Sequence, residues 1–453
     1  MATVTHLKTV ETEIARDTSG IGGHPRGLTT LFFTEFWERF SYYGMRAILV
    51  LYMAAPASQG GLEFDTAKAT SIYGTYTMSV YLTSLPGGWL ADRLLGARLA
   101  VLLGGITIAL GHFAMAVDSM SFFYGGMVLI AIGTGLLKPN ISTMVGGLYG
   151  EDDPRRDGGF SIFYMGINLG GMVAALVCGY LGQRVNYHVG FAAAGVGMVL
   201  GLFQYIAHRK RLAQVGARNK RASEEKTVII KQPLTAEEKK RLVVIGFLFL
   251  FSIIFWTVFE QTGSSFNLFA ERQTRNQIFG YEFPSSWFQS VNSFFILALA
   301  PLFAWLWARW GKRQPSSPSK FSFALLCAGL GLFIMALASS FTSSGRVSPL
   351  WLVALYFIHT VGELCLSPVG LSTVTKLAPA KMVGLMMGVW FLSIAIGNKF
   401  AGWAAGFYRD DASALFRLFG MLGLVALAGA VILAVLAPFI RRLISGQPEN
   451  ANQ

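Results

Sequence analysis

Residues 28–53 read LTTLFFTEFWERFSYYGMRAILVLYM, an apolar run long enough to cross a membrane that nevertheless carries Glu35, Glu38, Arg39 and Arg46. On insertion scales a charge at the bilayer centre costs about 2.5–3.5 kcal/mol. Four charges facing lipid would be a heavy penalty, so these side chains are expected to face a protein-lined, watery interior. Transport chemistry takes place in such an interior.

The composition of the whole chain is that of an integral membrane protein. Of its 453 residues 53% are hydrophobic and 13% are charged, and the mean hydropathy is +0.50. A soluble domain carries about 25% charged residues. The 51 glycines suit close helix packing in lipid. The three cysteines lie in apolar runs, where they are expected to be buried and free of disulfides: Cys178, Cys327 and Cys365.

Twelve apolar runs are long enough to span a bilayer, which requires about 20 residues per helix. They occupy residues 28–54, 69–91, 99–117, 121–148, 160–182, 188–208, 242–270, 286–309, 319–340, 349–375, 382–406 and 413–440. No period-two alternation persists, so strands are not expected. The sequence predicts an all-α fold with twelve transmembrane helices.

The basic residues predict the orientation of the chain. With a cytoplasmic N-terminus, the inside segments hold 26 of the 37 Lys and Arg residues and the outside loops hold six. The positive-inside rule therefore places both termini in the cytoplasm. Segment 209–241 carries eleven Lys and Arg against four Glu and is expected to be a cytoplasmic linker. It divides the chain into a tail, two six-helix bundles and a second tail, at residues 1–27, 28–208, 242–440 and 441–453.

Two six-helix halves joined by a long basic loop are the layout of the major facilitator fold. The second run ends in GGWLADRLLGAR, residues 87–98, with Asp92 and Arg93 near the predicted cytoplasmic edge. This string resembles the major facilitator motif between helices 2 and 3, in which charged residues latch neighbouring helices. We interpret it as a gating and folding element that says nothing about substrate.

Three cations and four carboxylates lie deep inside the predicted spans: Arg39, Arg46, Lys138, Glu35, Glu38, Glu260 and Glu363. If each cation pairs, one carboxylate is left over. In a low-dielectric interior such a group is most easily accommodated by binding a proton, so it is a candidate proton carrier. The alternative is a static network that only ties helices together, although buried ion pairs are poor stabilisers.

The spacing of the first four charges places them together. Glu35, Glu38 and Arg39 follow i, i+3, i+4 spacing and share one helix face, so Arg39 can contact either carboxylate. Arg46 is a heptad further along and faces nearly the same way. This arrangement predicts a switchable site.

Four strings of residues carry a family resemblance. Residues 35–44, EFWERFSYYG, resemble the E-x-x-E-R-F-x-Y-Y-G signature of the proton-dependent oligopeptide transporter family. Residues 159–170, GFSIFYMGINLG, resemble that family's F-Y-x-x-I-N-x-G signature, and residues 133–140 and 362–372 add GTGLLKPN and GELCLSPVGLS. The matches occur in the family's order, and the resemblance covers residues 25 to 440.

The resemblance implies import of di- and tripeptides coupled to inward proton flow, by alternating access. It assigns proton coupling to Glu35, Glu38, Arg39 and Glu260. It assigns the peptide carboxylate to Arg46 and Lys138, and the peptide amino group to Glu363 with Asn168 and Asn292 as polar helpers. It implies an aromatic pocket lining of Tyr42, Tyr43, Tyr81 and Trp390, and gating salt bridges Arg46–Glu260 and Lys138–Glu363.

Two departures from the family are visible. About 33 residues separate the sixth and seventh runs, too few for the two extra helices of many bacterial relatives. The second run has no histidine, which places more weight on Glu35, Glu38 and Glu260.

The rival functions are a transporter of nitrate, another small anion or a metabolite from the wider family, and a drug exporter of the same fold. An enzyme is not expected, because the sequence has no nucleotide loop, metal-ligand cluster or nucleophile constellation. We expect a multi-pass protein of the cell membrane, monomeric, without nucleic-acid partner, metal or cofactor, and driven by the proton gradient.

Overall fold

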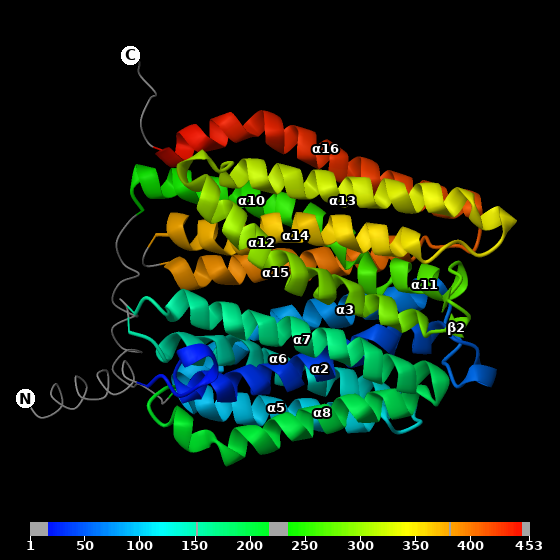
Figure 1. Ribbon diagram of the computed structural model, residues 1–453, viewed down its shortest axis with the longest axis horizontal. Coiled ribbons are helices and arrows are strands. Elements are labelled where there is room, and N and C mark those ends of the chain that lie inside the picture. Colours follow the sequence, from blue (N-terminus) through cyan, green and yellow to red (C-terminus); the bar gives the residue numbers. More distant parts are fainter. Residues whose placement is uncertain (1–16, 151–152, 217–233, 380–381, 446–453) are drawn as a thin grey trace, which may run out of the picture. The chain divides into compact units, whose positions relative to one another are not determined.

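The computed structural model describes residues 17–150, 153–216, 234–379 and 382–445, which are almost entirely helical (Figure 1). The predicted linker 209–241 and the two predicted tails lie partly outside these described residues. Cys178, Cys327 and Cys365 are free and buried, as predicted.

Ten helical segments of the described chain are long and apolar enough to cross a membrane. Their helices are α5 (Ala97–Met115), α6 (Met120–Gly147), α7 (Arg156–Arg184), α8 (Tyr187–Ala207), α10 (Ala236–Phe259), α12 (Gln289–Trp310), α13 (Ser317–Ser340), α14 (Leu350–Leu377), α15 (Val383–Ala405) and α16 (Ala412–Ser445). The two other predicted runs correspond to α2 (Arg26–Ala54), whose charges lower its hydropathy, and to the pair α3 (Thr66–Leu82) and α4 (Ser84–Leu90). The predicted all-helical membrane fold is confirmed.

The second predicted span is not one continuous helix. It breaks at Thr83, between α3 and α4, and ends in a π-helical turn, η3 (Ala91–Leu95). Pro86 has no backbone N–H for the carbonyl of Leu82, which weakens the helix at this point. The Thr83 hydroxyl donates a hydrogen bond to the carbonyl of Ala131 on α6 over 2.7 Å. The break is therefore held against a neighbouring helix.

The seventh predicted span also breaks, at a residue of the predicted site. Helix α10 gives way to the 3₁₀ turn η6 (Glu260–Gly263) and then to the short helix α11 (Ser265–Arg272). The fully buried Gln261 amide spans the break. It donates to the carbonyls of Thr257 and Ala401 over 3.2 and 3.1 Å and accepts from the Ser265 hydroxyl over 2.6 Å. Glu260 thus lies at the break, next to an amide that hydrogen-bonds to both sides of it.

Two short strands, which the sequence did not predict, form a hairpin between α11 and α12. Strands β1 (Gln277–Ile278) and β2 (Tyr281–Glu282) pair antiparallel. Phe279 and Gly280 form the turn with φ angles of 49° and 84°. Positive φ at both central residues is typical of a two-residue hairpin. The remaining short elements are η1 (Ile21–Gly23), η2 (Ala57–Gln59), η4 (Arg209–Leu212), η7 (Ser285–Phe288), η8 (Gly311–Arg313) and η9 (Thr342–Ser344).

The chain folds into two compact units. Unit 1 contains residues 1–49 and 79–225, and unit 2 contains residues 50–78 and 226–453. The boundary passes through α2 and α3. Compact units need not coincide with sequence halves, so the predicted bundles at 28–208 and 242–440 stay a prediction.

Close glycine contacts hold α5 and α6 together in unit 1. A Cβ on Gly104 would lie 2.6 Å from the Gly133 carbonyl oxygen, and one on Gly111 would lie 2.7 Å from the Gly126 carbonyl oxygen. Only glycine permits this approach, which replaces side-chain interdigitation with backbone contact in lipid. The apolar core of this unit extends from these helices to the start of α2 at Leu28 and Leu31.

Unit 2 uses the same kind of contact. Helices α13 and α16 lie side by side (Figure 1). The part of α3 that belongs to this unit packs on α15, where a Cβ on Gly74 would lie 2.9 Å from the Gly402 Cα. One turn away the Lys399 ammonium donates to the Thr75 hydroxyl over 2.6 Å. Small residues thus bring the two backbones together beside a polar contact.

Candidate functional site

Three charged residues of α2 form a buried cluster in unit 1. The Arg39 Nε lies 3.1 Å from Glu35 Oε1 and also donates to Glu38 Oε2. Glu35, Glu38 and Arg39 are 2%, 0% and 3% exposed. The i, i+3, i+4 spacing therefore brings two carboxylates to one guanidinium nitrogen.

This cluster is incompletely hydrogen-bonded. Glu35 Oε2, Glu38 Oε1 and Arg39 Nη2 are buried and have no hydrogen-bond partner among the described residues. In native proteins the large majority of buried polar atoms are partnered. Because one positive charge faces two negative ones, a proton on either carboxylate would balance the charge and give an unpartnered oxygen a hydrogen to donate. The geometry is suited to binding and releasing one proton.

Helix α7 packs closely behind the cluster. A Cβ on Gly170 would lie 2.3 Å from the Phe36 carbonyl oxygen and 3.1 Å from the Arg39 Cβ. Gly170 ends the sequence string I-N-L-G, so its absence of a side chain lets α7 fix the backbone beside Arg39. In the same string, Asn168 donates through Nδ2 to the Tyr164 carbonyl of its own helix over 3.0 Å.

Two aromatic rings of α2 lie beside the guanidinium groups of Arg39 and Arg46. The Arg39 guanidinium carbon lies 5.2 Å from the Tyr42 ring centroid and 5.9 Å from that of Tyr43. The buried Arg46 lies 6.0 Å from the Tyr43 centroid. Tyr43 therefore contacts both cations, and cation–π attraction stabilises charge without neutralising it.

Lys138 is the third cation of the predicted site in unit 1. It is half-buried on α6, and its ammonium lies 4.1 Å from the Tyr81 ring centroid. It is close enough to Glu35 to attract it electrostatically.

The residue after Lys138, Pro139, leaves the Gly135 carbonyl without its helical donor. A Cβ on Gly87 of α4 would lie 2.1 Å from that oxygen, so the freed carbonyl permits a close contact.

The two acidic residues of the predicted site in unit 2 are Glu363 on α14 and Glu260 at the break after α10. Asn292 of α12 donates through Nδ2 to Glu363 Oε2 and to Thr360 Oγ1, over 3.0 Å in each case. Glu260 is 3% exposed and close enough to Glu363 for the two carboxylates to repel each other. Two acids thus face one region, and a neutral amide positions one of them.

Trp390 lies in the core of unit 2. It is 3% exposed and packs edge-on against Phe321, with 6.0 Å between ring centroids. A Cβ on Gly370 would lie 2.1 Å from the edge of its indole ring, so the ring covers α14. Trp390 therefore packs against other residues of unit 2.

The structure brings the predicted residues together in two sets. Unit 1 holds Glu35, Glu38, Arg39, Arg46, Lys138, Asn168, Tyr42, Tyr43 and Tyr81, and unit 2 holds Glu260, Asn292, Glu363 and Trp390. The predicted gates Arg46–Glu260 and Lys138–Glu363 join residues of different units and stay predictions. Sequence reasoning missed Thr360, although its position three residues before Glu363 on one helix is a usable signal.

The chain is similar to known proteins over most of its length. The sequence pattern of the POT family matches residues 98–232 and 208–419. The uncharacterized transporter YclF of Bacillus subtilis is 43% identical, with 94% of this chain and 96% of that protein covered. A di-/tripeptide transporter of Lactococcus lactis subsp. cremoris is 38% identical, with 92% and 96% covered.

A solved structure shows the same fold over nearly the whole chain. The crystal structure of the peptide transporter POT in complex with sulfate superposes with a TM-score of 0.88 at 42% identity, and the match covers 96% of this chain and 99% of that chain. The similarity extends over both units and includes the helices that carry the buried charges. This chain belongs to the POT family.

Proposed function

We propose that this chain is a proton-coupled symporter that imports di- and tripeptides by alternating access. The observation that carries the proposal is the buried α2 cluster, in which two carboxylates share one guanidinium and each leaves an oxygen without a partner among the described residues. Membership of the POT family and the names of its relatives support the peptide class. The chain is a multi-pass protein of the cell membrane.

The charges suit the two ends of a peptide. A peptide is a zwitterion with a short separation between its carboxylate and its amine. We assign the carboxylate to Arg46 and Lys138 of unit 1 and the amine to Glu363 of unit 2, held by Asn292. Tyr42, Tyr43, Tyr81 and Trp390 are proposed as pocket residues, and for Asn168 we propose contact with the peptide.

The proton step follows from the shared guanidinium. When Glu35 or Glu38 binds a proton, the protonated side chain no longer competes for Arg39. The proton also neutralises the net negative charge of the cluster. Arg39 then holds one carboxylate more tightly and releases the other. Glu260, buried at the break in α10, is proposed to respond to this change through Arg46.

We propose that the ion pairs act as gates between the two accessible states. Lys138–Glu363 closes the inner side and Arg46–Glu260 closes the outer side. The peptide carboxylate competes for both cations, and its amine competes for Glu363. Binding of peptide and proton together therefore weakens one gate and permits the other, which couples the two fluxes.

The proposal also covers the orientation of the chain, its oligomeric state and its energy source. We propose that both termini are cytoplasmic, that the protein acts as a monomer, and that the proton gradient is its energy source without cofactor, metal or nucleic acid. We also propose that it transports its substrate chemically unchanged and is no enzyme, since its relatives are named as transporters.

Uptake by purified protein in liposomes tests the function. Labelled dialanine, nitrate and a cationic dye are supplied with and without an inward proton gradient. We expect gradient-dependent accumulation of dialanine that a protonophore abolishes, and no gradient-dependent accumulation of the other two. Accumulation of nitrate without dialanine would replace the proposal with the small-anion alternative, and accumulation of the dye alone would indicate a drug transporter.

A further inference from the structure

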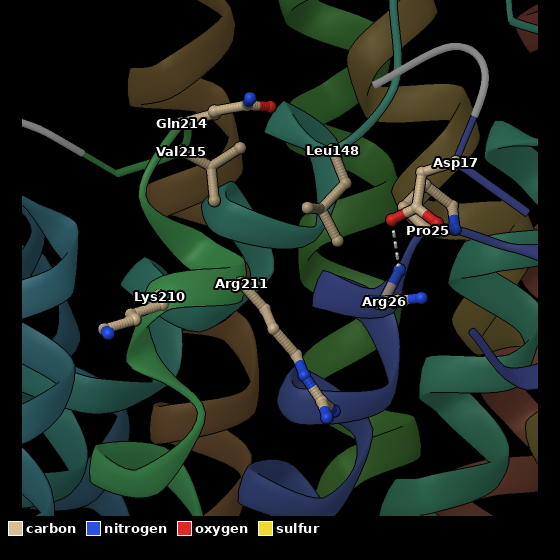
Figure 2. Close-up of a pocket in the computed structure, with 8 residues that line it drawn as sticks. All are labelled: Asp17, Pro25, Arg26, Leu148, Lys210, Arg211, Gln214 and Val215. Carbon is tan, nitrogen blue, oxygen red and sulfur yellow. Dashed lines mark hydrogen bonds between the residues drawn. The ribbon is translucent and has the colours of Figure 1, made fainter. Parts of the chain in front are cut away.

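A cavity of about 330 Å³ opens in unit 1 away from the charged cluster, where α2 begins and α8 ends (Figure 2). Three of its lining residues are cations, Arg26, Lys210 and Arg211. Leu148 and Val215 provide apolar walls. A cavity at a helix end that is lined by basic and apolar side chains is suited to an anionic group at the membrane surface.

The walls of the cavity are held by close packing. A Cβ on Gly27, in the first turn of α2, would lie 2.5 Å from a methyl group of Leu148 and 3.3 Å from the Arg211 carbonyl oxygen. Leu212 is fully buried and Val215 is 5% exposed. The turn η4 that carries Lys210 and Arg211 is therefore anchored directly after its exposed cations.

One carboxylate also lines the cavity, and its hydrogen bonds are local. Asp17 Oδ2 accepts from the Arg26 backbone N–H over 2.9 Å, and Oδ1 accepts from the Ser19 backbone N–H and hydroxyl over 3.1 and 2.5 Å. Burial acts to raise the pKa of Asp17, but these hydrogen bonds outweigh burial and hold the pKa below its ordinary value. Asp17 is thus ionised and caps α2, and the lining keeps an excess of two positive charges.

The two arginines and the lysine differ in direction. In Figure 2 the Arg211 side chain extends from the turn after α8 toward α2, where Arg26 begins the helix, whereas Lys210 extends the other way. Arg26 and Arg211 are exposed residues. The Arg26 guanidinium already donates through Nε to the Ser19 hydroxyl over 2.5 Å, so its terminal nitrogens are the ones proposed to bind phosphate. Guanidinium groups can form bidentate hydrogen bonds to a phosphate. They are the ligands that the geometry favours.

An exposed apolar stripe on α8 ends shortly before the basic turn that lines this cavity. Leu200, Phe203 and Ile206 on α8 are 45%, 73% and 46% exposed, and the helix ends at Ala207, directly before the basic turn. Large exposed apolar side chains at this spacing are typical of a helix surface against acyl chains. A phospholipid whose chains lie along this stripe would place its phosphate beside Arg211.

We propose that this cavity binds a phosphate group through Arg26 and Arg211, and that the phosphate is that of an anionic phospholipid head group. The shared chemistry, an oxyanion between two guanidinium groups, would also accept free phosphate. The exposed stripe on α8 favours the lipid. The proposal is independent of peptide transport, since none of these residues belongs to the α2 cluster.

Native mass spectrometry of the full chain in detergent tests the proposal. Phosphatidylglycerol, phosphatidylcholine or inorganic phosphate is added, and retained adducts are counted. We expect retained phosphatidylglycerol and little phosphatidylcholine. The Arg26→Gln/Arg211→Gln variant should retain roughly tenfold less phosphatidylglycerol, because it loses two charge-assisted contacts. The Arg209→Gln/Arg313→Gln variant removes the same charge outside the cavity and should bind like the unaltered protein.

Two other outcomes would overturn either the site or the assignment of the phosphate to a lipid. Equal losses in both double variants would overturn the site, because they would indicate attraction by net charge alone. Protection of the protein against thermal unfolding by inorganic phosphate, equal to that by phosphatidylglycerol, would keep the phosphate site and overturn the lipid assignment. If the double variant does not fold, Arg211→Gln alone, on an exposed turn, carries the same comparison with Arg209→Gln.

Discussion

The two carboxylates that share Arg39 are the residues whose replacement tests proton coupling. Glu35→Gln or Glu38→Gln removes a proton-binding group while it keeps the shape of the side chain. We expect either change to lower gradient-driven dialanine accumulation by about tenfold or more, equivalent to about 1.4 kcal/mol. Exchange of labelled for unlabelled dialanine across liposomes needs no net proton movement and should persist.

The matched control is Glu237→Gln, which removes the same charge from an exposed first turn of α10. It should accumulate dialanine normally. If Glu35→Gln and Glu38→Gln both accumulate dialanine like the unaltered protein, the coupling scheme is wrong and the cluster is a static tie between helices.

Asn292 is the residue that tests recognition of the peptide amine. Asn292→Leu removes the donor shared by Glu363 and Thr360 and leaves a half-buried carboxylate without its amide partner. Loss of one hydrogen bond to a charged group amounts to about 1.5–3 kcal/mol, so the KM for dialanine should rise by roughly tenfold or more. N-acetyl-dialanine has no amine to bind, and its weaker competition against dialanine should change little. An equal loss for both compounds would assign Asn292 a purely structural role.

At the scale of whole helices, the contact of α7 with α2 behind the cluster can be tested by adding one methyl group. In Gly170→Ala the new Cβ would lie 2.3 Å from the Phe36 carbonyl oxygen, so the two helices must separate. Overpacking of this kind costs about 1–3 kcal/mol. We expect a lower midpoint of thermal unfolding in detergent and slower dialanine uptake. In Gly125→Ala on α6, the added carbon would have no described atom within 4 Å apart from nearby backbone of its own helix, so this variant should unfold at the same temperature or higher.

The positions of the helices could be predicted because lipid imposes length and apolarity on each span. The predicted run 382–406 corresponds closely to α15, and run 188–208 to α8. The breaks at Thr83 and Glu260 were not predicted. Pro86 was a local signal for the first break, but the contacts that hold the two breaks come from other helices, at Ala131 and Ala401. Hydropathy carries no information about such partners.

The candidate site could be predicted in part for the same reason. The α2 cluster follows from helical periodicity alone, since three charges at i, i+3 and i+4 must share a face. The pairing of Asn292 with Thr360 and Glu363 joins two helices and could come only from family resemblance or from structure. The basic cavity beside Arg211 depends on how α2 packs against the turn after α8, which no linear pattern contains.

At the scale of the whole molecule, the predicted orientation in the membrane can be tested. An even number of spans places both termini on one side, and the basic residues place that side in the cytoplasm. Bacterial alkaline phosphatase is active only after export, so its fusion after Gln453 should be inactive, whereas fusion after Gly345 in the exposed loop between α13 and α14 should be active. A green fluorescent protein, which fluoresces only inside, should give the reverse pattern at the same two positions. Active phosphatase at Gln453 would show that both termini lie outside the cytoplasm, the reverse of the predicted orientation. It would then place the Arg26–Arg211 cavity in the outer leaflet and exchange the inner and outer gates.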